Sequence, residues 1–368
     1  MALLTVGCCR RATSQSVQDT PLPVTEVPLG RAEVPHDDEN LQADLKPWTA
    51  RAPLRANDTL TLYEALMARH FLPAVFKLVL IYNNRIYWPN REDVNGTEPP
   101  RPASPFKLTF HRRLTYLMTT GRLTLPNVLF VFSSEDNRPR WCAPGRKCAV
   151  PLFSMTKTLG EPDGDDEDIL IPQFNWAPSS LYLYPWHLKK DLAFFRGVPF
   201  CSGFWNNKTP NCSFVCPRAY FAWRSFEDQR SGRPRVLDVG LVEPYIMNNA
   251  GPKDLPLCTS KVPPVVPITP VSEHSQYKWL LHLEGITASS RLSQLFLTNS
   301  VVLFQQQPFV EYFYRSLKPN VHYVPFWMTT PAGIADVYDV VGRLRRLDRD
   351  EPAATQRIVR EAQMFAAK

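Results

Sequence analysis

The stretch Lys278-Trp-Leu-Leu-His-Leu-Glu-Gly-Ile-Thr-Ala-Ser-Ser-Arg291 decides the fold class of this chain. Its apolar first half predicts a buried strand over residues 278–283 and a turn at Glu284-Gly285. The small residues that follow predict a helix over about residues 289–298. A buried strand that passes through a tight turn into a helix is the repeating unit of α/β proteins with parallel sheets.

The same alternation continues on both sides of this stretch. Downstream, residues 301–304 and 321–325 predict strands and residues 309–314 predict a helix, and two more helices start near residues 334 and 350. Upstream, the sequence predicts strands at 76–82, 85–88, 128–132 and 192–195, a hairpin turn at Asn83-Asn84 and a helix that starts at Ser104-Pro105. We therefore expect an α/β fold.

The length of 368 residues suits two domains of ordinary size. Residues 1–58 are polar and rich in proline without periodicity, so we expect them to be disordered or loosely packed. Thr61-Leu-Tyr-Glu64 has the form of a capping box, and we expect ordered structure to begin there.

A net charge of +7 fits an anionic ligand, which includes phosphates, nucleic acids and membrane surfaces. The chain lacks zinc-finger spacing, RNP-like strands and dense Lys/Arg runs, so we expect no nucleic-acid partner. Arg343, Arg345, Arg346 and Arg349 have the spacing of a solvated helix face. No paired histidines indicate zinc, and the acidic run 163–168 lacks calcium-loop spacing, so we interpret it as a solvated turn and expect no metal.

Four sequons, at Asn57, Asn95, Asn207 and Asn211, favour an oxidising, glycosylating compartment such as the endoplasmic reticulum or Golgi lumen. There, Cys142/Cys148 and Cys201/Cys212/Cys216 are disulfide candidates whose partners spacing does not assign; buried free thiols are the alternative. The start, residues 1–9, is too short for a signal-peptide core. Three explanations fit this short start: a truncated N-terminus that lacks a membrane tether, export by another route, or a different compartment.

The small residues Ala288, Ser289 and Ser290 open the helix predicted from about residue 289. Unpaired N–H groups at a helix start bind anions, and small side chains let a phosphate approach closely. Arg291 in the first turn could grip a diphosphate through two hydrogen bonds. The alternative is an ordinary serine-capped helix with a surface arginine.

Two further stretches carry candidate chemistry. Arg196-Gly197 ends a predicted strand, where open α/β sheets bind ligands, and Arg218 follows about twenty residues later; surface arginines are the alternative. Glu135-Asp136 follows the predicted strand 128–132, and one of these two carboxylates could act as a general base, with a loop salt bridge as the alternative. Trp176 begins an aromatic segment that could stack on a sugar or belong to the core.

Several motifs together resemble glycosyltransferase family 90, the capsule-associated and Rumi-type protein O-glucosyltransferases. They keep the family's order, over about residues 75–365: Phe153-Ser-Met-Thr-Lys157, Phe194-Phe-Arg-Gly197, Tyr277-Lys-Trp-Leu-Leu-His-Leu-Glu-Gly285, Ala288-Ser-Ser-Arg291, Glu311-Tyr-Phe-Tyr-Arg-Ser-Leu-Lys-Pro319 and Val321-His-Tyr-Val-Pro325. The resemblance implies a GT-B fold of two Rossmann-like domains facing a central cleft, a UDP-sugar donor, no required metal and inversion at the anomeric carbon.

The resemblance also assigns roles to residues. It implies that Asp136 is the catalytic base and that the donor is bound by Arg196, Gly197, Arg218 and the segment from Ala288 to Arg291, while Glu135 and Trp176 would lie on the acceptor side. The sequence departs from the family after Gly197, where Val198-Pro-Phe-Cys-Ser-Gly203 replaces a Ser-Arg-Thr-Ser type loop, which makes Arg218 the least certain match. The usual Trp-Glu-Gly-Gly after Trp176 is missing, which leaves the acceptor undefined.

These observations predict an inverting, metal-independent transferase that moves glucose or xylose from UDP-glucose or UDP-xylose to a protein or polysaccharide hydroxyl. The alternative is an inactive member that binds glycans or nucleotide sugars. We expect an acceptor and base domain at 59–190, a donor domain at 191–330 and C-terminal helices at 331–368 that pack back across both.

Overall fold

The computed structural model describes residues 22–28, 38–51, 53–69, 75–89, 105–133, 140–142, 148–173, 180–205, 215–244, 263–327 and 336–367. The helices are α1 (Asp38–Thr49), α2 (Ala56–Arg69), α3 (Pro105–Thr119), α4 (Pro217–Arg230), α5 (Val271–His274), α6 (Leu292–Phe296), α7 (Val337–Asp350) and α8 (Pro352–Ala366), with 3₁₀ turns η3 (Trp186–Leu188) and η4 (Tyr314–Ser316). The strands are β1 (Thr25–Pro28), β2 (Phe76–Tyr82), β3 (Arg85–Tyr87), β4 (Val128–Ser133), β5 (Leu152–Ser154), β6 (Lys157–Thr158), β7 (Ile169–Leu170), β8 (Ser180–Leu183), β9 (Lys190–Gly197), β10 (Leu237–Leu241), β11 (Tyr277–His282), β12 (Val301–Gln305), β13 (Phe309–Val310) and β14 (Val324–Phe326).

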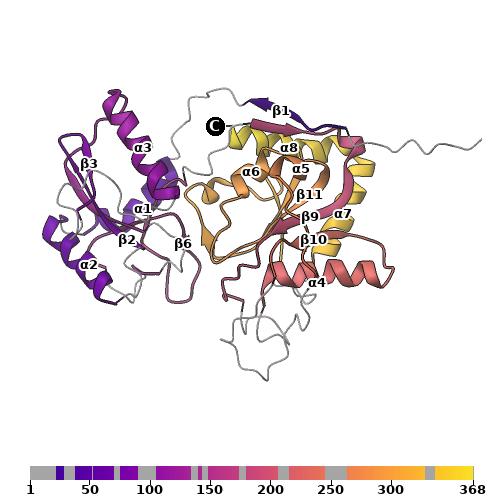
Figure 1. Cartoon of the computed structure of the whole chain (residues 1–368), viewed down its shortest axis with the longest axis horizontal. Helices are drawn as coiled ribbons and strands as arrows, with labels where there is room; N and C mark the ends of the chain where they lie inside the picture. Colours follow the sequence, from indigo (N-terminus) through magenta and orange to yellow (C-terminus); the bar gives the residue numbers. More distant parts are fainter. Residues whose placement is uncertain are drawn as a thin grey trace, which may run out of the picture.

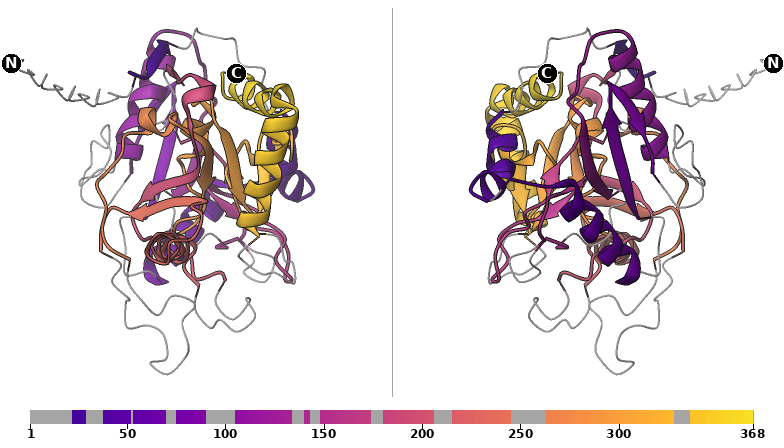
Figure 2. Two further views of the ribbon diagram at one scale, coloured as in Figure 1. Left: turned by 90° about the vertical axis from the view of Figure 1, so that its right-hand side faces the viewer. Right: turned by 90° about the vertical axis from the view of Figure 1, so that its left-hand side faces the viewer.

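The second half of the chain forms a five-stranded sheet with the order β10-β9-β11-β12-β14, in which every neighbouring pair is parallel. Alternate strand residues point to opposite faces. Phe195, Trp279 and Leu303 pack with α4 and α7 on one face, and Phe194, Leu280 and Val302 pack with α6 and α8 on the other. Because helices cover both faces, the strands are continuously apolar, as buried parallel strands are. The C-terminal helices flank this sheet in both side views (Figure 2).

The first half forms a mixed five-stranded sheet with the order β3-β2-β4-β5-β7. The hairpin β2–β3 and the pair β2–β4 are antiparallel, whereas β4–β5 and β5–β7 are parallel. Trp48 of α1 and Leu66 of α2 pack with Val131 against one face, and Phe110 and Met118 of α3 pack against the other. Figure 1 shows this sheet beside the second one, with β6 between them.

Short-range pattern predicted many of these elements but missed others, among them α1, α4 and β10. The hairpin forms about Asn83 and Asn84, which adopt φ of 47° and 55°, as the asparagines of a tight turn should. The helix predicted from Ser104-Pro105 is α3, and the predicted strands in the second sheet are present as β9, β11, β12 and β14. The predicted helix over residues 309–314 is wrong: the chain there forms the strand β13, which pairs with β6 in an antiparallel manner.

The expectation of a loose N-terminal segment is wrong for residues 22–28 and 38–51. β1 pairs with β8, and α1 lies against the β7 strand of the first sheet. The polar residues of α1 have partners far away in the sequence: Asn40 donates to Tyr312 O at 3.0 Å and to Ser316 Oγ at 2.9 Å. Thr61 does not cap a helix but lies inside α2, where its hydroxyl donates to Asn57 O at 2.9 Å.

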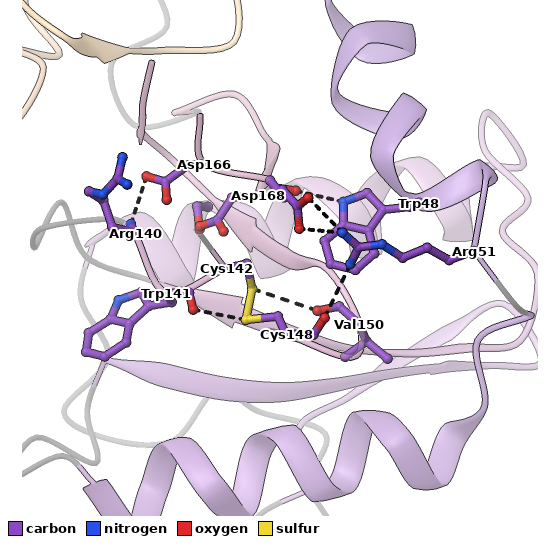
Figure 3. Close-up of a disulfide and its surroundings, with 11 residues drawn as sticks. Trp48, Arg51, Arg140, Trp141, Cys142, Cys148, Val150, Asp166 and Asp168 are labelled. Carbon is purple, nitrogen blue, oxygen red and sulfur yellow. Dashed lines mark hydrogen bonds and ion pairs between the residues drawn. A yellow bond between two sulfur atoms is a disulfide. The ribbon is translucent and has the colours of Figure 1, made fainter. Parts of the chain in front are cut away.

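The interpretation of residues 163–168 as a solvated turn holds for Asp163 but not for Asp166 and Asp168, which are buried. Asp166 Oδ2 accepts the backbone N–H groups of Arg140 and Thr158 at 2.8 and 3.0 Å, and Asp168 Oδ2 accepts the Ser154 hydroxyl at 2.5 Å. Figure 3 shows both carboxylates beside the Cys142–Cys148 disulfide. Burial raises the pKa of Asp168 to about 7, with Asp166 as the next cause.

Among the residues that the structure describes, no helix combines the length and the apolar character that crossing a bilayer requires.

Candidate functional site

The second sheet has its topological switch point between β9 and β11. The chain passes from β9 to β10 on one side and then returns to β11 on the other side of β9. Open α/β sheets bind ligands outside the carboxyl ends of the two strands that flank such a point. β9 ends at Gly197 and β11 ends at His282, so the candidate site is formed by the loops after these two residues.

Arg218, at the start of α4, turns its guanidinium into this switch point. Nε donates to Glu284 O at 2.7 Å, Nη2 to Leu283 O at 3.3 Å and Nη1 to Val198 O at 3.0 Å. The residue is buried and its guanidinium lies 5.4 Å from the Phe195 ring centroid. Arg218 therefore joins the loop after β9 to the loop after β11.

Arg291, just before α6, also reaches the switch point. Its Nη1 donates to the backbone carbonyl of Arg196, and its guanidinium lies 5.5 Å from the Phe195 ring centroid. Burial lowers the pKa of Arg291, because desolvation disfavours the charged form. The guanidinium groups of the buried Arg218 and the half-buried Arg291 thus both lie near the Phe195 ring at the switch point.

Gly197 allows this close approach. A Cβ at this position would lie 2.8 Å from the Phe195 ring and 3.4 Å from Arg291 Nη1. The structure therefore places Gly197 next to Arg291.

The segment from Ala288 to Arg291 differs from the predicted helix start. The helix α6 begins only at Leu292, with Arg291 as its N-cap residue, and is five residues long. Ala288 is buried, whereas Ser289 and Ser290 are half-buried. These residues form a loop between β11 and α6. Close approach of a phosphate would therefore depend on their small side chains and not on a helix dipole.

The Arg196 side chain does not join the other two arginines. Its Nη2 donates to Asp238 Oδ1 at 2.7 Å and its Nη1 to Asp238 O at 2.8 Å. Tyr277 donates to the other carboxylate oxygen at 2.9 Å. The side chain is thus committed to β10, and the contribution of Arg196 to the switch point is its backbone carbonyl, which holds Arg291.

A buried polar network contacts the loop between β11 and α6 at Ser289. Tyr314 OH lies 3.2 Å from His282 Nε2, 3.3 Å from Glu311 Oε1 and 3.4 Å from Ser289 O. Desolvation raises the pKa of Glu311 to about 8 and lowers the pKa of His282 to about 3, the latter with help from Arg218 and Arg291. The His282 imidazole is therefore neutral at physiological pH, which suits a site already rich in positive charge.

Glu284 is a residue that the sequence pattern identified only as part of a turn. It is fully buried, and its carboxylate accepts the Ser202 hydroxyl and, at 2.9 Å, the Trp205 Nε1–H. Its backbone carbonyl holds Arg218. A glutamate beside a glycine in a predicted turn gave no signal of this role, because both partners lie about eighty residues upstream.

The first sheet meets the second at its own carboxyl edge. Thr156, two residues beyond the end of β5, donates to Thr287 Oγ1 at 3.4 Å. β4 runs parallel to β5 in a register that pairs Val131 with Leu152 and Phe132 with Phe153, so β4 also ends at this edge. β4 ends at Ser133. Ser134, Glu135 and Asp136 come next in the sequence and lie outside the described residues.

Trp176, Asn95, Asn207 and Asn211 also lie outside the described residues. Asn57 is exposed at the start of α2. The rest of the aromatic segment after Trp176 lies away from the switch point: Trp186 packs against Trp279 and donates to Asp348 Oδ1 at 2.9 Å. The structure pairs Cys142 with Cys148 and Cys201 with Cys216, and the second disulfide spans the loop between β9 and α4.

Comparison with known proteins shows the family of this chain. A family model described as Glycosyl transferase family 90 matches residues 33–368. The chain belongs to this family. A similar curated protein is protein O-glucosyltransferase 1 of Bos taurus, 29% identical over 218 residues, which are 57% of this chain and 50% of that protein. Another is protein O-glucosyltransferase 3 of Mus musculus, 26% identical over 262 residues, which are 68% of this chain and 45% of that protein.

This family 90 chain is also 30% identical to the O-glucosyltransferase rumi homolog of Anopheles gambiae over 189 residues, which are 48% of the chain and 42% of that protein. The chain thus spans about half the length of the curated relatives it matches.

Proposed function

We propose that the chain is an inverting, metal-independent glycosyltransferase that moves glucose or xylose from a UDP-sugar to a hydroxyl of a protein or glycan acceptor. One observation carries the proposal: the buried Arg218 and the half-buried Arg291 converge at the switch point of a parallel sheet in a family of glycosyltransferases. Without a cation, such groups must neutralise the departing diphosphate.

We further propose a GT-B arrangement, with the base domain at 59–190 and the donor domain at 191–330. The C-terminal helices at 331–368 were expected to pack across both domains, but the described residues of α7 and α8 pack with the second sheet. The Thr156–Thr287 contact supports the GT-B arrangement, because the carboxyl edges of the two sheets come together there. The parallel register of β4 and β5 supports Asp136 as the base, since β4 ends three residues before it at that edge. Glu135 and Trp176 would then contact the acceptor.

The reaction would be a single in-line displacement. Asp136 takes the proton of the acceptor hydroxyl, whose oxygen forms a bond to the anomeric carbon as the bond from that carbon to the UDP oxygen breaks. UDP leaves with the electron pair, and the guanidinium groups of Arg218 and Arg291 stabilise its growing charge. We place the chain in the lumen of the secretory pathway, which the two disulfides and the exposed Asn57 sequon support.

The test is release of UDP from UDP-glucose and UDP-xylose with candidate acceptors, with and without magnesium. Asp136→Asn should abolish transfer and leave UDP affinity unchanged, and Asp163→Asn, at an exposed carboxylate outside the proposed site, is the matched control, which should retain transfer. Equal losses in both variants would contradict the assignment of the base.

A second candidate is an inactive member that binds nucleotide sugars. It is favoured by the hydrogen bonds that Arg218 and Arg291 already make to backbone carbonyls, which leave less of each guanidinium for a phosphate. Binding of UDP-sugars without release of UDP, across a panel of protein and glycan acceptors, would identify this alternative.

A further inference from the structure

Phe200 is an exposed aromatic residue at the switch point. Its side chain is 48% exposed, and it lies in the loop after β9. A Cβ built on Gly285 would lie 2.9 Å from Arg218 Nη2 and 3.7 Å from Phe200 Cβ. A guanidinium, a bare glycine backbone and an apolar ring therefore adjoin one another.

The chain is fixed on both sides of this ring. Before it, Val198 O accepts Arg218 Nη1 at 3.0 Å and the Phe200 N–H at 2.9 Å. After it, Cys201 is joined to Cys216, and Ser202 donates to the buried carboxylate of Glu284. An exposed ring on a mobile loop needs no explanation, because single apolar side chains are common on protein surfaces. Here the backbone is held at three consecutive points while the ring faces solvent, which preorganises an apolar surface.

The position of the ring indicates which part of a donor it would meet. Gly285 N–H donates to Thr287 O at 2.8 Å, and Thr287 contacts Thr156 of the first sheet. Phe200 therefore adjoins the loop after β11, the loop through which Thr287 contacts the first sheet. In a donor whose diphosphate is held by the arginines, the transferred sugar must point toward the acceptor domain and the base away from it.

On the basis of the proposed function, we infer that Phe200 packs against the C–H face of the donor's pyranose ring and contributes to selection of the sugar. Aromatic faces bind the apolar faces of such rings, and a contact of this kind changes affinity by up to about tenfold. Phe200 belongs to the loop that departs from the family pattern, so the contact is specific to chains with this loop.

Isothermal titration of the full chain with UDP, UDP-glucose and UDP-xylose tests the inference. Phe200→Ala should weaken binding of at least one UDP-sugar by about fivefold and leave UDP affinity within about twofold. Phe200→Tyr should retain the wild-type ratio of UDP-sugar to UDP affinity. Tyr116→Ala, at a ring on α3 that is 47% exposed, is the control and should change neither affinity.

Two results for Phe200→Ala would overturn this inference and leave the proposed function intact. One is an unchanged affinity for UDP-sugars. The other is an equal loss of affinity for UDP and for UDP-sugars, which would place the ring on the nucleobase. If Phe200→Ala does not fold, Phe200→Leu decides, because it keeps the apolar volume without the aromatic face. Failure of the wild-type chain to bind UDP or any UDP-sugar would instead overturn the proposed function, and this inference with it.

Discussion

Arg315 donates through Nη2 to Asp44 Oδ1 at 2.7 Å, across 271 residues of sequence. The same carboxylate pairs with Lys157 of β6 and accepts the Leu170 N–H at 3.0 Å. Arg315 also donates to Asn40 O at 2.7 Å. The helix α1 therefore links the first sheet to the segment after β13, which lies in the chain between β12 and β14 of the second sheet.

Asp44→Asn should lower the free energy of unfolding by about 3 kcal/mol, because it leaves two cations near an uncharged amide in a buried position. Urea unfolding monitored by fluorescence measures this change. Asp163→Asn removes an exposed partner of Arg140 and should cost under about 1 kcal/mol. Equal effects of the two substitutions would show that the Asp44 contacts do not hold the sheets together.

Substitutions of Arg196, Arg218 and Arg291 should differ in how much they change the affinity for UDP. Arg218→Lys and Arg291→Lys keep the charge but lose the planar fork, so each should weaken UDP binding by about tenfold. Arg196→Lys should change UDP affinity by less than about twofold and act on stability instead, because its side chain is bound to Asp238. Titration with UDP beside thermal unfolding measures both quantities, and a tenfold loss in Arg196→Lys would contradict this division.

Gly285→Ala should weaken UDP binding and lower stability by about 1–2 kcal/mol, since the new Cβ would lie 2.9 Å from Arg218 Nη2. Arg218 cannot move away without losing its bonds to Glu284 and Val198. Gly342→Ala is the matched control: its Cβ would meet only Arg346 Nη1 at 3.8 Å, within α7. That change should stabilise the protein by up to about 1 kcal/mol, because alanine favours a helix. A Gly285→Ala variant with wild-type stability and UDP affinity would refute the steric argument.

The pH dependence of stability should carry a contribution from Glu311. Its folded pKa, about 8, is raised above the ordinary value of 4.5, so the folded state binds a proton more tightly than the unfolded state. Its contribution to stability is fully present below pH 4.5 and is lost as the pH rises through 8. Glu311→Gln, which still accepts from Tyr314, should therefore gain stability relative to wild type between these pH values.

Urea unfolding at pH 5 and pH 8.5 measures this difference. Glu64→Gln, at an exposed position on α2, is the control and should give a curve parallel to that of the wild type. Parallel curves for Glu311→Gln as well would mean that Glu311 titrates normally in the folded protein.

The sequence anticipated elements whose cause is local. Asn83-Asn84 specifies a turn by tolerating positive φ, and Ser104-Pro105 starts a helix because proline fits its first turn. It failed where distant partners decide the conformation. Residues 309–314 carry a helical pattern, but Phe309 and Val310 pair with Thr158 and Lys157, a contact that no short window contains.

The burial of polar residues was missed for the same reason. Asn40 and Asp44 of α1, and Asp166 and Asp168 of the acidic run, have the composition of solvated segments. Groups 8 to 276 residues away, such as Thr158 and Ser316, form hydrogen bonds with them. Sequence alone gives the cost of burying a charge but not whether a partner offsets it.

The amino-acid sequence by itself determined the α/β class, the family and the set of candidate site residues, because these depend on periodicity and on motifs that stay together in the chain. Only the tertiary structure decided which of those residues meet. It directs Arg218 and Arg291 to the Phe195 ring, and it directs Arg196 to Asp238. The reason is that the parallel register of β9, β10 and β11 fixes which side chains share a sheet edge and which share a face.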